Sequence, residues 1–417
     1  MHEPFKQSPV AKCTRRALFG GAIAGAVVMT PGCSFVNRFG EIPEGKLAES
    51  IHTSPNWIDG EFRNQQPTSV MVGKDGFIEA WWKFLTNSIP DLKPAAPLPC
   101  THTDLSKLDP NRDIAVWLGH SGLYFQLAGL RFLVDQVYSA YASPVSFVNK
   151  SFEFRGGYPF TAKTTPPIDL LILTHDHWDH LDCETIKALD HKVKRYAVPL
   201  GVNSHLLAWG INPDKILVFD WYDAARFTDP KPEVLHPFHK PEKRLQPAEW
   251  KSGALQAPAI YFFPSRHFSG RTLKRDQTLW GSYVIEAGGK RLYLSGDGGN
   301  GSHFKEIGDL FRDSGGFDLA FIEDGQYNAD WAEIHMAPEG SVKAATEVGA
   351  KSVIPIHNCR YALARHAWFD PLERFRMASH LADWKLLTPK VGDVVPIGDL
   401  TIEFPAWWRD VPKGASA

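Results

Sequence analysis

The stretch IDLLILTHDHWDHLD, residues 168–182, joins an apolar run to a dense cluster of metal-ligating side chains. The run at 170–173 predicts a strand buried on both faces, so the cluster lies at the carboxyl end of that strand. Three histidines and two aspartates fall within residues 175–180, a density that a solvated charged loop does not explain. In such a loop His175 and His177 can face one ion, while Asp179 and His180 face a second point nearby. Imidazole and carboxylate suit zinc, so the stretch predicts a metal site.

Length and composition indicate a soluble globular protein. The chain has 417 residues, of which 43% are hydrophobic and 22% are charged, and its formal net charge is −2. This length allows one large domain or two. Because the charge is nearly balanced and no long basic run occurs, nucleic acid is not expected as a partner.

The first 33 residues are interpreted as a targeting segment. Arg15 and Arg16 precede the uncharged run 17–29, which is too short to span a bilayer comfortably. This pattern resembles a signal for the twin-arginine export machinery, so a periplasmic location is expected. Cys33 follows the run as in a bacterial lipoprotein, where a lipidated cysteine would hold the protein at the membrane surface. An uncleaved apolar tail is the alternative.

The remaining sequence predicts a lead-in followed by one large domain. Residues 34–110 are rich in Pro, Asn and Ser and are interpreted as a linker and lead-in, with one helix near 76–86. The main domain is expected at 111–405, with a surface insertion at 230–247 and a tail at 406–417. Strands are predicted at 114–118, 123–127, 131–134, 196–198 and 216–219, with helices at 183–189 and 202–209.

Three later strands each precede a potential metal ligand. Strand 259–263 precedes His267, strand 291–295 precedes Asp297, and strand 353–356 precedes His357. One strand that ends in histidine or aspartate is common, but the repetition indicates a set of ligands. Strand ends are where α/β proteins place their chemistry, so these residues are expected at the same site as the 175–180 cluster.

The pattern H-x-H-x-D-H after a buried strand resembles the metallo-β-lactamase superfamily, and the later strand ends match its ligand order. The resemblance implies an α/β fold, a four-layer αββα sandwich, and two zinc ions per chain. By this resemblance His175, His177 and His267 would bind the first zinc, Asp179, His180 and His357 the second, and Asp297 would bridge them.

Between residues 114 and 370 the resemblance narrows to the N-acyl-phosphatidylethanolamine-hydrolysing phospholipase D family. Leu118-Gly119-His120 and Leu279-Trp280-Gly281-Ser282 are among the matching segments. The resemblance implies a zinc-dependent phosphodiesterase that acts on N-acyl-phosphatidylethanolamine-like lipids, through a hydroxide shared by two metals. Asp179 and Asp297 would lie at the catalytic centre. His335 matches a position near the substrate and could protonate the leaving group, the alternative being a surface histidine at a helix start.

Departures from the family pattern keep other functions open. Gly298-Gly299-Asn300 replaces the usual Thr, Gly and aromatic residue after Asp297, and Glu323 and Asp324 replace apolar residues. If either carboxylate faces the site, it would repel an anionic phosphodiester. The alternative is that Glu323 and Asp324 are simply exposed on the surface. A lactonase or other acyl hydrolase is therefore the second hypothesis. A non-catalytic exported metal-binding protein is the third, although a structural zinc is usually closed by four ligands.

Four residues near the predicted ligands have no assigned role. His120 and Asp135 follow strands at places that could approach the site, and a hydrogen-bonded structural role is the alternative for His120. Cys183 and Cys359 could line the site, although small buried cysteines are the more common case.

Overall fold

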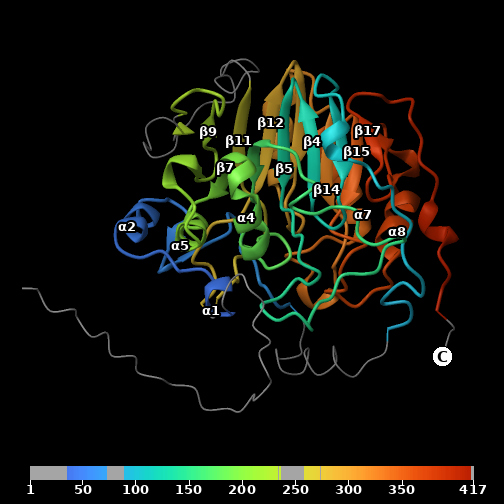
Figure 1. Cartoon of the computed structure of the whole chain (residues 1–417), viewed down its shortest axis with the longest axis horizontal. Coiled ribbons are helices and arrows are strands. Elements are labelled where there is room, and N and C mark those ends of the chain that lie inside the picture. The colour runs from blue at the N-terminus through green and yellow to red at the C-terminus, as the bar shows by residue number, and fades with distance from the viewer. Residues whose placement is uncertain (1–34, 73–88, 233, 236–257, 273, 415–417) are drawn as a thin grey trace, which may run out of the picture.

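A computed structural model describes residues 35–72, 89–232, 234–235, 258–272 and 274–414 (Figure 1). The expected targeting segment with Cys33, the helix near 76–86 and most of the insertion at 230–247 lie outside the described residues. Among the described helices, none combines the length and the apolar character that a membrane crossing needs.

The first large sheet is built around the strand that precedes the ligand cluster. Its strands are β3 (Ile114–Trp117), β4 (Leu123–Leu127), β5 (Leu130–Val134), β6 (Ile168–Ile172), β7 (Val193–Pro199), β8 (Ile216–Phe219) and β17 (Val394–Pro396), in the order β17-β3-β4-β5-β6-β7-β8. The hairpins β3-β4 and β4-β5 are antiparallel, as predicted. Strands β5 to β8 pair in parallel, with α4 (Cys183–Leu189) between β6 and β7 and α5 (Asn203–Ala208) between β7 and β8.

The second large sheet carries the later ligand strands. Its strands are β9 (Ala224–Ala225), β10 (Val234–Leu235), β11 (Ala259–Phe263), β12 (Ser282–Ala287), β13 (Lys290–Leu294), β14 (Leu319–Glu323), β15 (Ser352–Ile356) and β16 (Lys385–Leu386), in the order β10-β9-β11-β12-β13-β14-β15-β16. Pairing is antiparallel from β10 to β13 and parallel from β13 to β16. Helices α6 (His303–Arg312), α7 (Pro338–Val348) and α8 (Asp370–Ala378) complete this half.

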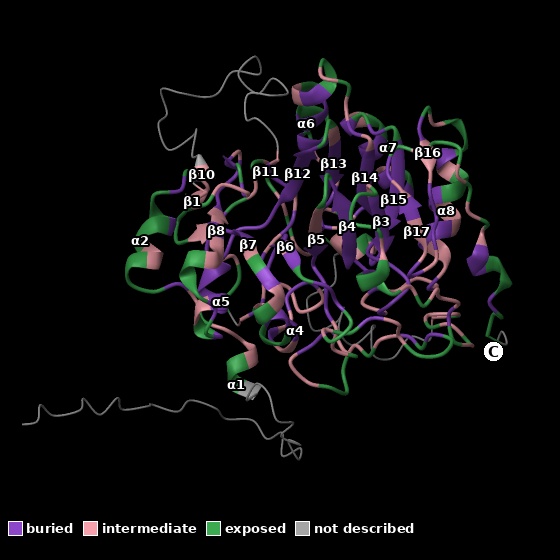
Figure 2. Ribbon diagram, turned by 45° about the horizontal axis from the view of Figure 1, so that its top comes forward, coloured by how far each residue is buried: buried purple, intermediate pink, exposed green. Residues whose placement is uncertain are grey.

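Alternation along β14 shows how the layers form. Leu319 and Phe321 belong to the apolar cluster that the two sheets share, whereas Ala320 and Ile322 belong to a second cluster with residues of α6, α7 and α8. Both faces of the sheet are therefore covered, and its central strands β11 to β15 are buried along nearly their whole length (Figure 2). The predicted four-layer αββα sandwich is confirmed.

Local sequence signals explain where the helices begin and end. Helix α4 starts directly after the ligand loop because Asp182 caps it, accepting a hydrogen bond from Thr185 N at 3.1 Å. Helix α7 has Pro338 at its first position and ends at Gly349, whose φ of 77° lies in the left-handed region. Short 3-10 helices occur at Leu105–Lys107, Asp190–Lys192, Pro213–Lys215, Ala329–Trp331, Ser379–Leu381 and Trp407–Asp410.

Both ends of the described chain pack on the sandwich. The lead-in contains α1 (Phe35–Arg38), α2 (Lys46–His52) and the small antiparallel pair β1 (Trp57–Ile58) and β2 (Glu61–Phe62). At the other end Trp407 and Trp408 are buried, and Trp408 Nε1 donates a hydrogen bond to Glu373 Oε2 at 2.8 Å. The segment expected as a tail therefore begins with residues that contribute to the core.

Candidate metal centre

The ligand residues follow strands that end at the same edge of the sandwich. Strands β11, β13 and β15 point the same way, because β12 reverses the chain between β11 and β13, and β14 lies parallel to both β13 and β15. Strand β6 of the other sheet delivers the 175–180 cluster to this edge. The structure thus brings all seven predicted ligands together.

The first group consists of His175, His177, His267 and Asp297, whose ligand atoms all lie within 4.8 Å of one another. His177 Nδ1 is 2.8 Å from His175 Nε2 and 3.2 Å from His267 Nε2. Asp297 Oδ2 is 3.8 Å from His175 Nε2 and 4.0 Å from His267 Nε2. Three imidazole nitrogens and one carboxylate oxygen therefore converge on one point.

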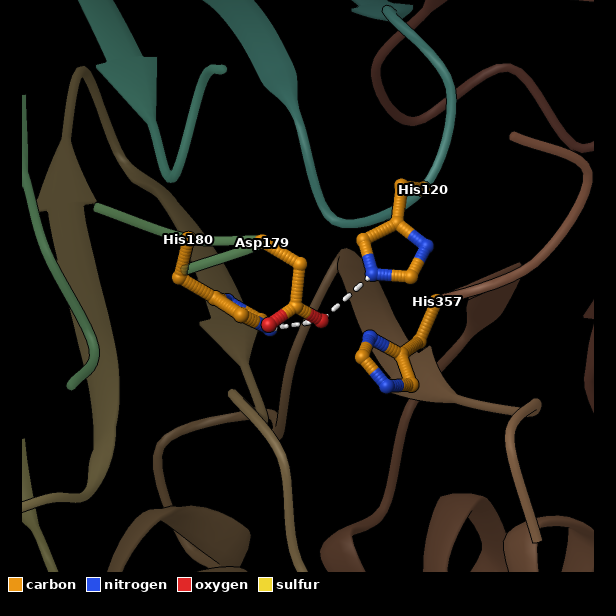
Figure 3. Close-up of side chains that lie close together, drawn as sticks. All are labelled: His120, Asp179, His180 and His357. Carbon is orange, nitrogen blue, oxygen red and sulfur yellow. Dashed lines mark hydrogen bonds and ion pairs between the residues drawn. The ribbon is translucent and has the colours of Figure 1, made fainter. Parts of the chain in front are cut away.

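The second group adjoins the first through Asp297. Its Oδ2 atom is 3.1 Å from His180 Nε2, and its Oδ1 atom is 3.2 Å from His357 Nδ1. His180 Nε2 is also 3.4 Å from Asp179 Oδ2. Figure 3 shows Asp179, His180 and His357 with His120 around this second point. The Asp297 carboxylate lies between the two groups, where the resemblance placed a bridging ligand.

His120 is the residue whose role the sequence left open. Its Nε2 donates a hydrogen bond to Asp179 Oδ2 at 2.8 Å, and burial lowers the pKa of His120 to about 4. Its loop is joined to the His357 loop by two backbone hydrogen bonds, from His120 N to Asn358 O and from His357 N to His120 O, each 3.0 Å long. Both histidines have positive φ, 54° and 67°, a strained conformation that is typical of functional sites.

Hydrogen bonds to the second ring nitrogen fix the orientation of several histidines. Asp135 Oδ2 is 2.8 Å from His180 Nδ1, which leaves His180 Nε2 facing Asp297. His267 Nδ1 donates to Ile334 O at 3.0 Å, which leaves its Nε2 facing the first group. Metal-binding histidines in proteins are commonly oriented in this way.

Burial keeps most of these imidazoles in the metal-binding form. It lowers the pKa of His175, His267 and His357 well below the ordinary histidine value, and it lowers the pKa of His177 to about 4. All four are therefore neutral near pH 7. A neutral imidazole has a free lone pair, which is what a cation requires.

Charge and unsatisfied atoms both indicate that a cation fits here. Burial opposes a charge on His180, but Asp297, Asp179 and Asp135 outweigh it and raise the pKa of His180 well above its ordinary value. Burial also raises the pKa of Asp297, to about 7. Within the described residues, His180 Nε2 and Asp297 Oδ1 are buried and make no hydrogen bond. Buried polar atoms are rarely left so, and a divalent cation between these nitrogens and oxygens would satisfy both.

His335 lies beside the two groups and not on the open surface. Its side chain is 13% exposed, and its Nδ1 is hydrogen-bonded to Glu323 Oε1. Glu323 is fully buried and also accepts from Gly298 N at 2.9 Å. Surface exposure is therefore wrong for Glu323, and also for Asp324, which is fully buried. Burial raises the pKa of both carboxyls well above their ordinary values.

Two glycines explain the unusual sequence around Asp297. Gly296 has a φ of 59°, and a Cβ there would lie 2.6 Å from Gly281 O. A Cβ at Gly299 would lie 1.9 Å from Glu333 O. Gly299, within the departure from the family pattern, therefore allows the chain that carries His335 to approach the Asp297 loop closely.

A cavity of about 260 Å³ opens onto both groups and His335. Its apolar wall consists of Val70, Met71, Phe268, Trp331, Ile334 and Leu363. Arg275 supplies a positive charge, while Glu323 is not among the residues that line the cavity. Cys183 and Cys359 are buried and belong to none of the clustered ligand groups among the described residues.

Comparisons with known proteins agree with this geometry. The family model described as the beta-lactamase superfamily domain matches residues 131–358. An uncharacterized protein of Mycobacterium tuberculosis is 32% identical over 362 residues, which cover 85% of this chain and 88% of that protein. The N-acyl-phosphatidylethanolamine-hydrolyzing phospholipase D 1 of Caenorhabditis elegans is 26% identical over 300 residues, which cover 68% of this chain and 76% of that protein.

Two further similarities are more limited. The outer membrane protein RomA of Klebsiella pneumoniae is 49% identical over 118 residues, which cover 28% of this chain and 87% of that protein. The solved structure of a metallo hydrolase from Ignicoccus hospitalis covers 68% of this chain and 97% of that chain, with 16% identity and a TM-score of 0.47. Because that score is low, the family assignment rests on the sequence matches.

Proposed function

The chain belongs to the metallo-β-lactamase superfamily of metal-dependent hydrolases, and from this premise we propose that it is a phosphodiesterase of phospholipase D type. The observation that carries the proposal is the pair of ligand groups that share Asp297 and open into a largely apolar cavity. The similarity to the Caenorhabditis elegans phospholipase over 68% of this chain supports the same substrate class. A structural metal would instead be enclosed by its ligands.

His175, His177 and His267 would hold one cation, Asp179, His180 and His357 a second, and Asp297 both. When bound, two divalent cations supply Lewis-acid stabilisation of the charge that develops on phosphoryl oxygens and a water of lowered pKa. Zn²⁺ fits the nitrogen-rich donor set.

The protein's own contribution to proton transfer is assigned to His335. Glu323 accepts its Nδ1 hydrogen, so Nε2 is the nitrogen that is free to exchange a proton with the substrate. His335 lines the cavity beside Asp297. Its Nε2 is therefore placed to take the proton that the attacking water releases and to give that proton to the leaving alcohol oxygen. Glu323 lies behind His335 and does not line the cavity, so an anionic substrate meets His335 rather than this carboxyl group.

The cavity wall matches an amphiphilic substrate. Phe268, Trp331 and the other apolar side chains bury hydrocarbon and exclude water from the reacting bond, while Arg275 faces the same cavity with a positive charge. A lipid with an anionic phosphodiester and acyl chains satisfies both features. N-acyl phosphatidylethanolamine is such a lipid, and its acyl chains complement the apolar wall.

The proposed location is the periplasmic side of a membrane, reached through the twin-arginine machinery. The Arg15-Arg16 pattern and the position of Cys33 support export. The similarity to a protein named as an outer membrane protein supports an envelope location. Mass spectrometry of the native amino terminus tests this proposal, and a cytosolic protein that retains Met1 would contradict it.

Hydrolysis of two substrate sets tests the proposed function. The zinc-loaded protein is assayed on phosphodiesters, including N-acyl phosphatidylethanolamine, and on lactones, with His180→Ala as the control variant. The proposal predicts phosphodiester turnover that is lost in the variant. Lactone turnover alone would still be consistent with the metal site, but it would show that the protein is an acyl hydrolase and not a phosphodiesterase.

A further inference from the structure

A segment that precedes the family-matched region contacts the loops beside the metal centre and contributes to the cavity wall. We name residues 64–72 the strap. It is fastened to the loops that carry Arg266 and His335: Arg266 Nε donates to Thr68 Oγ1 at 3.0 Å, Ser69 N donates to Glu333 Oε2 at 2.6 Å, and Val72 N donates to Asp330 O at 2.8 Å. The strap begins at Asn64, next to His267, and reaches the cavity at Val70 and Met71.

Asn64 forms both backbone hydrogen bonds of His267. Its Nδ2 donates to His267 O at 2.7 Å, and its Oδ1 accepts from His267 N at 3.1 Å. Trp280 Nε1 also donates to Asn64 Oδ1, at 3.2 Å, which holds the amide in this orientation. His267 lies beyond the end of β11, and the isolated bridge beside it pairs Arg266, not His267, with Gly299. The two bonds span 203 positions of sequence.

We propose that Asn64 is a positioning residue of the metal centre, which fixes the backbone of His267 so that its Nε2 faces the first ligand group. Ile334 O holds the imidazole at Nδ1, and Asn64 holds both the N–H and the carbonyl of the His267 backbone. Only Nε2 is then left to bind a cation, and it points in a fixed direction. Partners of this kind typically change metal affinity by 10–100-fold. The first ligand group is therefore completed by the lead-in, outside residues 131–358.

The test measures metal affinity rather than turnover, so it is independent of the substrate. Zn²⁺ is titrated against a chromophoric chelator into the full chain, and Co²⁺ absorption reports the geometry at the same site. Asn64→Ala removes both bonds, and Asn64→Asp retains only the acceptor. Gln65→Ala is the matched control, because exposed Gln65 donates to Tyr222 OH, at 2.8 Å, away from the ligands.

We expect Asn64→Ala to lower the affinity for one of two cations by about 10–100-fold and Asn64→Asp to lower it less. Gln65→Ala should leave both affinities unchanged. Thermal unfolding of the metal-free proteins separates positioning from general stability. Metal affinities in Asn64→Ala equal to those of the unchanged protein would overturn the proposal. A loss shared equally by both cations, accompanied by lower stability of the metal-free variant, would also overturn it.

Discussion

Replacing Asp135 with Asn tests how far metal binding depends on residues behind the ligands. Asp135 is 2% exposed, and its Oδ2 lies 2.8 Å from His180 Nδ1. Its Oδ1 accepts from Thr174 N at 2.9 Å. An asparagine can keep the bond to Thr174 N, but its amide nitrogen, in place of Oδ2, cannot accept from His180 Nδ1 or from Thr174 Oγ1. The imidazole then rotates or changes tautomer, and Nε2 loses its fixed orientation.

The expected size of the effect follows from this single lost acceptor. Partners of metal-binding histidines contribute about 10–100-fold in affinity, which corresponds to about 1.4–2.8 kcal/mol. Because His180 belongs to the second group, the affinity for one of two cations should fall by this factor. The affinity for the other should change less, since Asp135 reaches the first group only indirectly, through Thr174 Oγ1, which lies 3.0 Å from His175 Nδ1. Competition with a chelator of known affinity measures both steps in one titration.

Asp169→Asn is the matched control for this substitution. Asp169 lies on β6, the strand that also precedes the ligand loop, and its Oδ2 accepts from Arg131 N at 3.0 Å. This carboxylate touches no ligand group, so its replacement should leave both affinities unchanged. An Asp135→Asn variant whose two affinities stay within twofold of the original would refute the orienting role.

Three further outcomes are expected. His335→Asn should lower kcat by about 10²–10⁴-fold with metal content unchanged, because the proton donor to the leaving group is lost. Steady-state kinetics with metal analysis checks this, and an unchanged kcat would contradict it. Arg275→Gln should raise KM by roughly tenfold for anionic phosphodiesters and leave KM for neutral esters unchanged, whereas equal effects on both would argue against anion binding. Burial lowers the pKa of His303 to about 3, whereas the pKa of this histidine in the unfolded chain is 6.5. As the pH drops below about 6.5, the unfolded chain therefore binds a proton that the folded protein does not, and the free energy of unfolding falls. Between pH 7 and pH 5 the free energy of unfolding should therefore fall by about 2 kcal/mol more in the original protein than in His303→Gln, and equal losses in urea titrations would contradict this.

The sequence alone predicts the elements that have strong local patterns. Strand 259–263 and helix 183–189 lie at the predicted residues, because their apolar periodicity and capping are local. Strands β9 and β17, with two and three residues, have too little pattern to be found. The pairing of β17 with β3 depends on packing between distant parts of the chain, which local propensity does not contain.

The candidate site divides in the same way. Strand ends predict Asp297 and His357 as ligands because each follows its own buried strand. The role of His120 depends on a left-handed turn and on a hydrogen bond to Asp179, 59 positions away. Asn64 acts through backbone bonds to His267 over 203 positions, and nothing in its neighbourhood resembles a metal motif. The candidate ligands can therefore be identified from the sequence, whereas the residues proposed to position them are found only from the fold.

Hydrolysis of N-acyl phosphatidylethanolamine in water labelled with oxygen-18 tests the central claim most directly. A phosphodiesterase of phospholipase D type brings water to phosphorus, so the label should appear in the phosphate of phosphatidic acid and be absent from the released N-acylethanolamine. An acyl hydrolase brings water to a carbonyl carbon instead. Label found in a fatty acid carboxylate, with the phosphodiester intact, would contradict the account.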